Sequence, residues 1–157
     1  MKEVTPFLWF DTQAEEAATF YTSLFDDGKI TKVLHYGSAG PGESGSVMTV
    51  DFELAGQKFM ALNAGPQYRF NESVSFLIHC DTQEEVNRYW SQLTEGGEPR
   101  PCGWLKDKYG LFWQIVPKLL FTLRDDPDQV KGQAVMAAML NMGKIESAEL
   151  QRVYDNA

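Results

Sequence analysis

Residues 4–63 carry a hydrophobic pattern that predicts one helix among four strands. The apolar and aromatic run at residues 4–10 suits a strand, and apolar side chains then recur at helical spacing over residues 14–25. Thr12, followed three residues later by Glu15, fits a capping box at the start of that helix. The remaining strands are expected at residues 29–36, 47–54 and 57–63, with a Gly/Ser-rich hairpin loop over residues 37–46.

The same order of elements recurs in residues 74–117. The tripeptide Asp11-Thr12-Gln13 returns seventy positions later as Asp81-Thr82-Gln83, and a strand-like apolar run precedes each copy. An aromatic pair follows each copy, Phe20-Tyr21 in the first half and Tyr89-Trp90 in the second. We therefore interpret the chain as a duplication in which each half reads strand, helix, strand, strand, strand.

The second copy closes with a predicted hairpin over residues 101–117. A polar turn separates an arm that contains Trp104 from a β-rich arm that Pro117 ends, because proline cannot donate to a sheet ladder. Gln114 is the polar residue inside this second arm, and period-2 alternation places it on one face with Phe112. The face that carries Gln114 is therefore the first candidate for a working site.

Residues 118–157 differ from both halves and predict a helical tail. Asp126-Pro127 is typical of an N-cap followed by a first-turn proline, and an apolar stripe then runs over residues 130–142. A last short helix is expected at residues 147–154. The tail either packs a core of its own or, as the alternative, forms a dimer surface.

Composition and charge narrow the function classes. The 157 residues carry a net charge of −8, and the pI is about 4.7, which argues against nucleic acid and against an anionic membrane surface as partners. The two cysteines provide no disulfide framework and no CxxC metal spacing. The first residues show no signal-peptide pattern, and no apolar run is long enough to span a membrane, so we expect a cytoplasmic protein.

Three stretches of this sequence together resemble a known family. They are Thr5-Pro6-Phe7-Leu8-Trp9-Phe10-Asp11 with Glu15-Glu16-Ala17, then Cys102-Gly103-Trp104-Leu105-x-Asp107-x-x-Gly110-x-x-Trp113-Gln114-Ile115-Val116-Pro117, and finally Ala137-x-Met139-Leu140-x-Met142-x-Lys144-Ile145. In these motifs the chain resembles the vicinal oxygen chelate (glyoxalase/bleomycin-resistance) superfamily. It is most similar to the PhnB-like branch, which often carries the domain name 3-demethylubiquinone-9 3-methyltransferase.

The resemblance implies an α+β fold of two tandem βαβββ modules with a C-terminal helical tail. The chain is then a single vicinal oxygen chelate-like domain over residues 1–157, with module one at about 4–63, module two at about 74–117 and the tail at about 118–157. Members of this superfamily place an active site between two modules, and we expect a homodimer.

The superfamily's enzymes hold a divalent metal with His and Glu side chains on the first and last strands of each module. Those places fall near Val4 (or Pro6), Asn63, Val74 and Gln114, and none of these residues is His, Asp or Glu. Valine and proline have no donor atom, and an amide oxygen is a weak ligand for a transition metal. We therefore expect no metal site and no cofactor.

Other candidate chemistry is sparse. His35 and His79 have no Glu or His at chelating spacing, and His79 alternates away from the expected metal face. Cys102 lacks an evident third group for a nucleophilic arrangement, Cys80 reads as a small core residue, and Asp107 suits a turn better than a general base. The methyltransferase name has no support in the motifs, because no strand leads through a glycine-rich turn into a helix.

These observations favour a metal-independent PhnB-like protein that binds a small, partly apolar molecule in a cleft between the modules. The amides of Asn63 and Gln114 would orient the polar atoms of the ligand, because an amide both donates and accepts. The expected walls are Trp104, Phe76 and Phe112. Two alternatives stay open: a divalent-metal glyoxalase or dioxygenase with a rearranged site, using His79 or His35 with Glu53, and a drug-sequestering resistance protein. Whether the chain is an enzyme at all also stays open.

Overall fold

The structure, a computed structural model, describes all 157 residues of the chain. The chain divides into two compact units, Met1–Phe70 and Asn71–Ala157, and each unit is built on one four-stranded sheet. None of the helices has the length and apolar character needed to cross a lipid bilayer.

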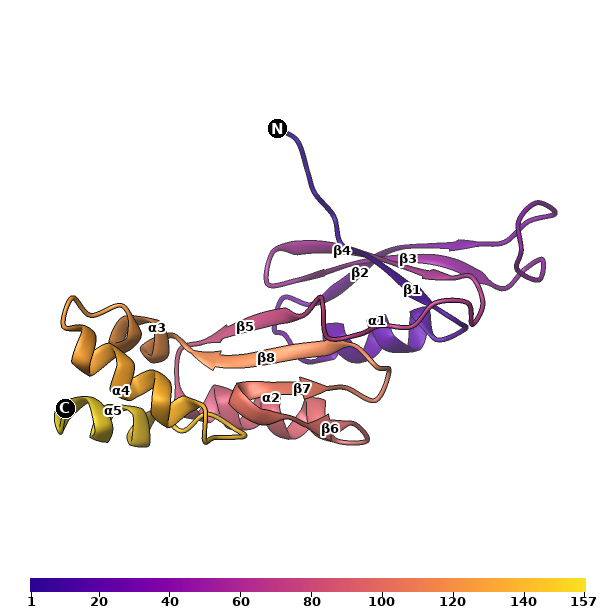
Figure 1. Cartoon of the computed structure of the whole chain (residues 1–157). Coiled ribbons are helices and arrows are strands. Elements are labelled where there is room, and N and C mark those ends of the chain that lie inside the picture. Colours follow the sequence, from indigo (N-terminus) through magenta and orange to yellow (C-terminus); the bar gives the residue numbers. More distant parts are fainter. The chain divides into compact units, whose positions relative to one another are not determined.

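Unit one has the predicted order of strand, helix and three strands (Figure 1). Its elements are β1 (Phe7–Phe10), α1 (Ala14–Ser23), β2 (Lys29–His35), β3 (Val47–Leu54) and β4 (Gln57–Asn63). The sheet order is β1-β4-β3-β2, with β1 parallel to β4 and the other pairs antiparallel. Helix α1 covers one face of this sheet, where the ring centroids of Tyr21 and Phe52 lie 6.3 Å apart.

The β3–β4 hairpin turns at the expected pair, Ala55 and Gly56. Both residues have a positive φ, 49° and 80°, as a two-residue turn between twisted antiparallel strands requires. Because glycine has no Cβ, it adopts such a φ at little cost, and this hairpin fixes the register of the whole of β4.

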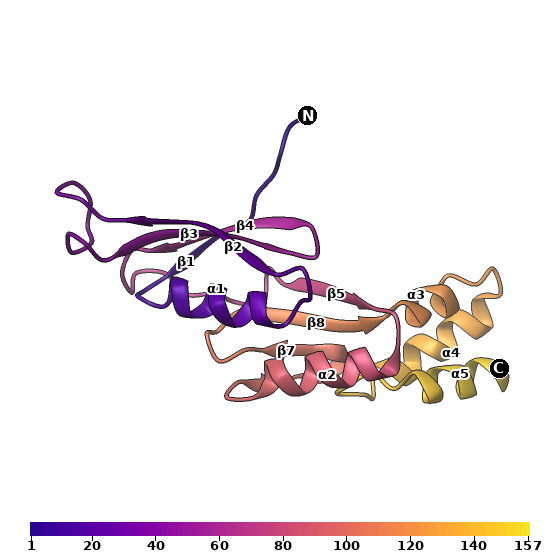
Figure 2. The same cartoon turned by 180° about the vertical axis from the view of Figure 1, so that it is seen from behind.

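Unit two repeats the order and adds the tail. Its module comprises β5 (Phe76–Cys80), α2 (Gln83–Thr94), β6 (Glu98–Pro99), a 3-10 turn (Pro101–Gly103), β7 (Trp104–Lys106) and β8 (Phe112–Pro117). The sheet order β5-β8-β7-β6 matches that of unit one, and β5 is parallel to β8. Viewed from behind, α1 and α2 each run along their own sheet (Figure 2). The predicted duplication is confirmed at the level of topology.

The two copies of the Asp-Thr-Gln motif start their helices differently. In the second copy the hydroxyl of Thr82 accepts from the backbone N–H of Glu85 at 3.2 Å, and the Glu85 carboxylate accepts from the Asp81 N–H at 2.8 Å, so a complete capping box forms. The capping box expected at Thr12 is wrong. Helix α1 has Gln13 at its N-cap with no side-chain cap from its own segment.

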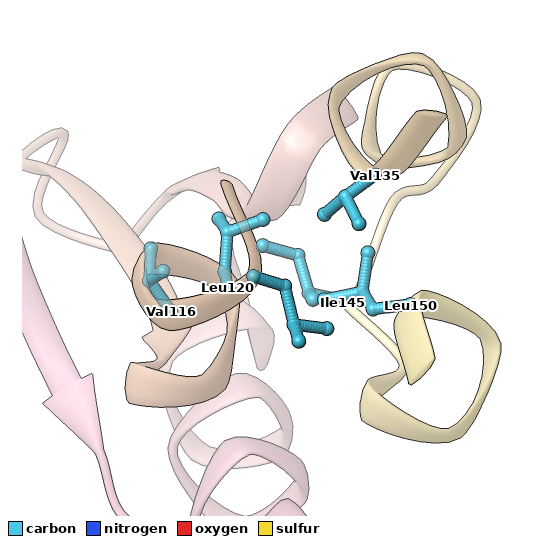
Figure 3. Close-up of a cluster of buried hydrophobic side chains, with 6 residues drawn as sticks. Val116, Leu120, Val135, Ile145 and Leu150 are labelled. Atoms are coloured by element: carbon cyan, nitrogen blue, oxygen red, sulfur yellow. The ribbon is translucent and has the colours of Figure 1, made fainter. Parts of the chain in front are cut away.

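The tail forms three helices that pack on unit two. They are α3 (Lys118–Arg124), α4 (Gln129–Met139) and α5 (Ser147–Asp155). Apolar side chains from β8 and all parts of the tail point toward one another in a buried cluster (Figure 3), made of Val116, Leu120, Leu123, Val135, Ile145 and Leu150. The tail therefore packs a core together with the sheet. The N-cap of α4 is Asp128 rather than the predicted Asp126, because the Asp128 carboxylate accepts from the N–H groups of Val130 and Lys131.

The segment before α5 is attached to module two through its backbone. The N–H groups of Cys102 and Gly103 donate to the carbonyls of Met142 and Gly143, both at 2.8 Å. Gly103 has a φ of +80°, and a Cβ there would lie 2.8 Å from the Cδ1 atom of Ile145. Only glycine allows this close approach, so this residue of the sequence motif serves the attachment of the tail.

Asp107 is a buried carboxylate that holds the turn between β7 and β8. Its side chain is 2% exposed, and its Oδ1 accepts from the N–H groups of Tyr109 and Leu111 at 2.8 and 3.1 Å. Its Oδ2 accepts from the indole N–H of Trp113 at 2.9 Å. The expected turn-forming role is confirmed, and it explains how a buried charge is tolerated here.

We predict that Asp107→Ala lowers the free energy of unfolding by about 3 kcal/mol, because it removes the acceptor of three hydrogen bonds at a buried site. Chemical denaturation monitored by circular dichroism measures the loss. Asp26→Ala, at an exposed carboxylate, is the matched control and should stay within about 0.5 kcal/mol of wild type. Equal stability of the two variants would show that the turn does not depend on Asp107.

Candidate functional site

The parallel strand pairs determine which residues of the two modules correspond. Phe10 and Cys80 each come directly before a copy of Asp-Thr-Gln, and they pair with Asn63 and Pro117 respectively. Asn63 therefore corresponds to Pro117. The counterpart of Gln114, which pairs with Leu77, is Met60, which pairs with Phe7. This corrects the expectation that Asn63 and Gln114 hold equivalent places.

Each sheet has a face turned away from its own helix, which we call the distal face. In sheet two it carries Leu77, Trp104, Lys106, Phe112 and Gln114, because residues paired across neighbouring strands point to the same side. The other face, which α2 covers, carries Leu105, Trp113 and Ile115, each at most 2% exposed. The predicted alternation of Gln114 and Phe112 against the residues between them is confirmed.

Gln114 is half-buried on the distal face, and its amide is only partly used by the chain. Its Nε2 donates to the Oγ of Ser75 at 3.0 Å, which fixes the orientation of the side chain. The Oε1 atom has no hydrogen-bond partner in the chain, so one acceptor stays available to a ligand. Trp104 lies directly opposite Gln114 on β7 and offers an apolar surface beside that acceptor.

Three of the five residues predicted to bind ligand thus share one face, namely Gln114, Trp104 and Phe112. Phe76 lies on the opposite face, where it pairs with Trp113 and the two ring centroids are 5.8 Å apart. Alternation along the sequence could not show which residues of β5 share the Gln114 face, because the register between β5 and β8 decides it. His79 alternates against Phe76 as predicted, but it lies on the Gln114 face, so the expectation that the Phe76 face of β5 is the metal face shared with Gln114 is wrong.

Asn63 lies in the other unit and makes structural bonds. Its Oδ1 accepts from the N–H of Ala14 at 2.8 Å, which satisfies the start of α1 in place of Thr12, and its Nδ2 donates to the carbonyl of Val47 at 3.2 Å. The Tyr36 hydroxyl donates to the Asn63 carbonyl. Asn63 also lines a pocket of about 620 Å³ with Tyr36 and several acidic residues of α1 and the loop before β3.

The residues expected near the metal positions, Val4, Asn63, Val74 and Gln114, include no His, Asp or Glu. On the distal face of unit two, Gln114 lies beside Ser75. The correspondence of the modules makes Thr5 and Met60 the counterparts of Ser75 and Gln114, and these two residues line a pocket of about 380 Å³ beside Asp51.

The remaining candidates do not form a reactive cluster. Nowhere in the chain do three or more His, Cys, Asp or Glu side chains come together as metal ligands. His79 lies against Phe121, 5.4 Å between ring centroids, and His35 is exposed at the end of β2. Burial raises the pKa of the Cys80 thiol to about 12, so Cys80 stays protonated at neutral pH and is a core residue.

The distal face also carries charges that sequence reasoning missed. Arg100 continues β6 in extended conformation, and its N–H donates to the Trp104 carbonyl at 2.9 Å. Its guanidinium lies over the Phe112 ring, 5.3 Å from the centroid. Lys106 pairs with Phe112 on one side and with Glu98 on the other. β6 has only two paired residues, too few for a hydrophobic pattern to reveal it.

Comparison with known protein families and solved structures agrees with the fold described above. The profile of the 3-demethylubiquinone-9 3-methyltransferase family matches residues 2–116. The chain belongs to this PhnB-like family. No curated protein matches the chain. The family match ends at β8, so the helical tail lies outside it.

Solved structures include relatives of the same fold. A putative 3-demethylubiquinone-9 3-methyltransferase, PhnB protein, from Bacillus cereus is 35% identical, with a TM-score of 0.66, over 74% of this chain and 99% of that one. Protein PA1353 from Pseudomonas aeruginosa is 20% identical, with a TM-score of 0.62, over 74% and 98%. The fosfomycin resistance protein FosX from Listeria monocytogenes, complexed with Mn(II) and sulfate, is 17% identical, with a TM-score of 0.50, over 73% and 89%, and shares the fold. The chain thus shares its fold with these three proteins.

We predict that Asn63→Ala costs this PhnB-like protein about 2 kcal/mol of unfolding free energy, because the variant loses the cap of α1 and the bond to Val47. Thermal and urea denaturation measure the effect. Asn87→Ala, on the exposed side of α2, should change stability by less than about 0.5 kcal/mol. A fully stable Asn63→Ala would mean that α1 does not need this cap.

Proposed function

We propose that this PhnB-like protein binds a small, partly apolar molecule on the distal face of sheet two, without a metal ion. The observation that carries the proposal is the amide of Gln114, which Ser75 holds in place while its Oε1 stays uncommitted. A half-buried polar group of fixed orientation beside an apolar wall is the usual composition of a ligand site. Trp104, which is half-buried, supplies that wall, whereas the Phe112 ring is only 1% exposed and lies beneath this face rather than at its surface.

Binding on this face is direct recognition by side chains. A neutral amide accepts from a ligand N–H or O–H and donates to a ligand carbonyl, and it needs no charge to do so. In superfamily enzymes a metal ion binds paired oxygens of the substrate. Thr5, Met60, Ser75 and Gln114 provide no anionic or imidazole ligand that would hold such a metal ion here.

Methyl transfer is not part of the proposal. Nucleotide-derived cofactors are commonly held where a glycine-rich turn leads from a parallel strand into a helix. In this chain, the turns before α1 and α2 are Asp11-Thr12-Gln13 and Asp81-Thr82, and the side chain of Thr82 serves as a helix cap. The family's name thus has no structural counterpart in these turns.

We also place the protein in the cytoplasm as a homodimer. Its two cysteines are free thiols, which supports a reducing compartment. The exposed apolar side chains of Val130 in α4 and of Leu140 at its C-cap support association of chains through the tail.

Protein purified without chelators should contain far less than one equivalent of any transition metal, because the distal faces lack a ligand set. Elemental analysis measures the content. Addition of Mn²⁺, Fe²⁺, Ni²⁺ or Zn²⁺ should leave the thermal midpoint unchanged, since a metal that binds only the native state raises it. One tightly held equivalent would overturn the metal-independent proposal and favour the metalloenzyme alternative.

Gln114→Ala should weaken binding of a neutral probe about tenfold, the equivalent of one hydrogen bond of about 1.4 kcal/mol. The probe is 4-hydroxyphenylacetamide, with affinity measured by ligand-observed NMR titration. The unfolding free energy should change by less than about 1 kcal/mol, because only the Ser75 contact is lost.

Gln133→Ala, at an exposed glutamine of α4, is the matched control and should bind the probe as wild type does. Undiminished binding by Gln114→Ala, or no binding by wild type at millimolar probe, would contradict the proposed site.

A further inference from the structure

The distal face of sheet two has a local charge opposite to that of the whole protein. Its charged residues are Arg100, Lys106 and Glu98. Two cations therefore share one carboxylate, on a chain whose net charge is −8. This local positive excess lies on the face where Gln114 also points.

The cations are only loosely neutralised. The Arg100 Nη2 atom lies 3.7 Å from a Glu98 oxygen, and the Lys106 Nζ atom lies 3.8 Å from the other. Both distances exceed hydrogen-bond length, and Glu98 is more than half exposed. The N–H groups of the Arg100 guanidinium therefore have no hydrogen-bond acceptor in the chain.

The Arg100 side chain is nevertheless held in place. Its backbone is bonded to Trp104, and its guanidinium carbon lies over the buried ring of Phe112, 5.3 Å from the centroid. A guanidinium that rests against a ring loses less freedom when it binds than a mobile one. A guanidinium can form two parallel hydrogen bonds with an oxyanion.

Arg100, Trp104 and Gln114 lie in one row across three neighbouring strands. Adjacent strands are about 4.8 Å apart, so the backbones of Arg100 and Gln114 are separated by about 10 Å. A molecule with an oxyanion at one end, an aromatic or apolar middle and a polar group at the other end matches this row.

We propose that Arg100 binds an oxyanion of the ligand, either a planar carboxylate or a tetrahedral phosphonate or phosphate, while Trp104 contacts its middle and Gln114 its far polar group. Lys106 adds long-range attraction on the same face. This inference rests on the proposed function and narrows its ligand to organic anions.

The test compares three probes that differ at one end: 4-hydroxyphenylacetate, its neutral amide 4-hydroxyphenylacetamide, and 4-hydroxybenzylphosphonate. Wild type should bind an anionic probe at least tenfold more tightly than the amide, because a charge-assisted bidentate pair is stronger than neutral hydrogen bonds. The preference should fall as salt rises. The anionic probe that binds more tightly shows whether the site is shaped for a planar or a tetrahedral group.

Arg100→Gln should abolish the preference for anions and leave affinity for the amide within about twofold. Arg100→Lys keeps the charge but loses the fork, so it should retain part of the preference. Arg124→Gln is the matched control, because Arg124 also stacks on a phenylalanine, Phe121, but lies in the tail, and this variant should bind all probes as wild type does. Circular dichroism verifies that each variant is folded.

The outcomes separate this inference from the proposed function. If the amide binds as tightly as the anions and Gln114→Ala weakens all of them, the site stands and the oxyanion inference is wrong. A preference for anions that survives Arg100→Gln also overturns the inference. If anions bind through Arg100 but Gln114→Ala has no effect, oxyanion recognition stands and the proposed role of Gln114 fails. No binding of any probe at millimolar concentration overturns both.

Discussion

The parallel pairing of the first and last strand of each module is the constraint on which the rest depends. It joins β1 to β4 and β5 to β8, although the strands of each pair are separated by a helix and two further strands. This pairing sets Gln114 beside Leu77, and it turns Phe76 to the covered side. A shift by one residue would exchange the two faces, because side chains alternate along a strand.

The two modules keep one topology but assign their polar residues differently. Module two caps its helix from within its own motif, through Thr82, whereas module one uses Asn63 from the end of a distant strand. Where module two carries Gln114 on its distal face, module one carries Met60. Duplication has preserved backbone hydrogen bonding, which every copy must satisfy, while the side chains that define a site have diverged.

The tail connects structure and site in unit two. Val116 shares the distal face with Gln114, but it is buried in the cluster formed by α3, α4 and α5. Phe121 of α3 lies against His79 on the same face. The tail therefore covers the end of the distal face that carries Val116 and His79.

The sequence by itself determined the order of elements, the duplication, the turns at Ala55-Gly56 and Asp107, and the face shared by Gln114 and Phe112. These features depend on local periodicity and turn chemistry, which neighbouring residues express directly. Only the tertiary structure decided the register between strands distant in sequence, and with it the correspondence of Gln114 to Met60 and the structural role of Asn63. It also brought Arg100 into the site, because a strand as short as β6 is defined by its pairing with β7 and not by its own pattern.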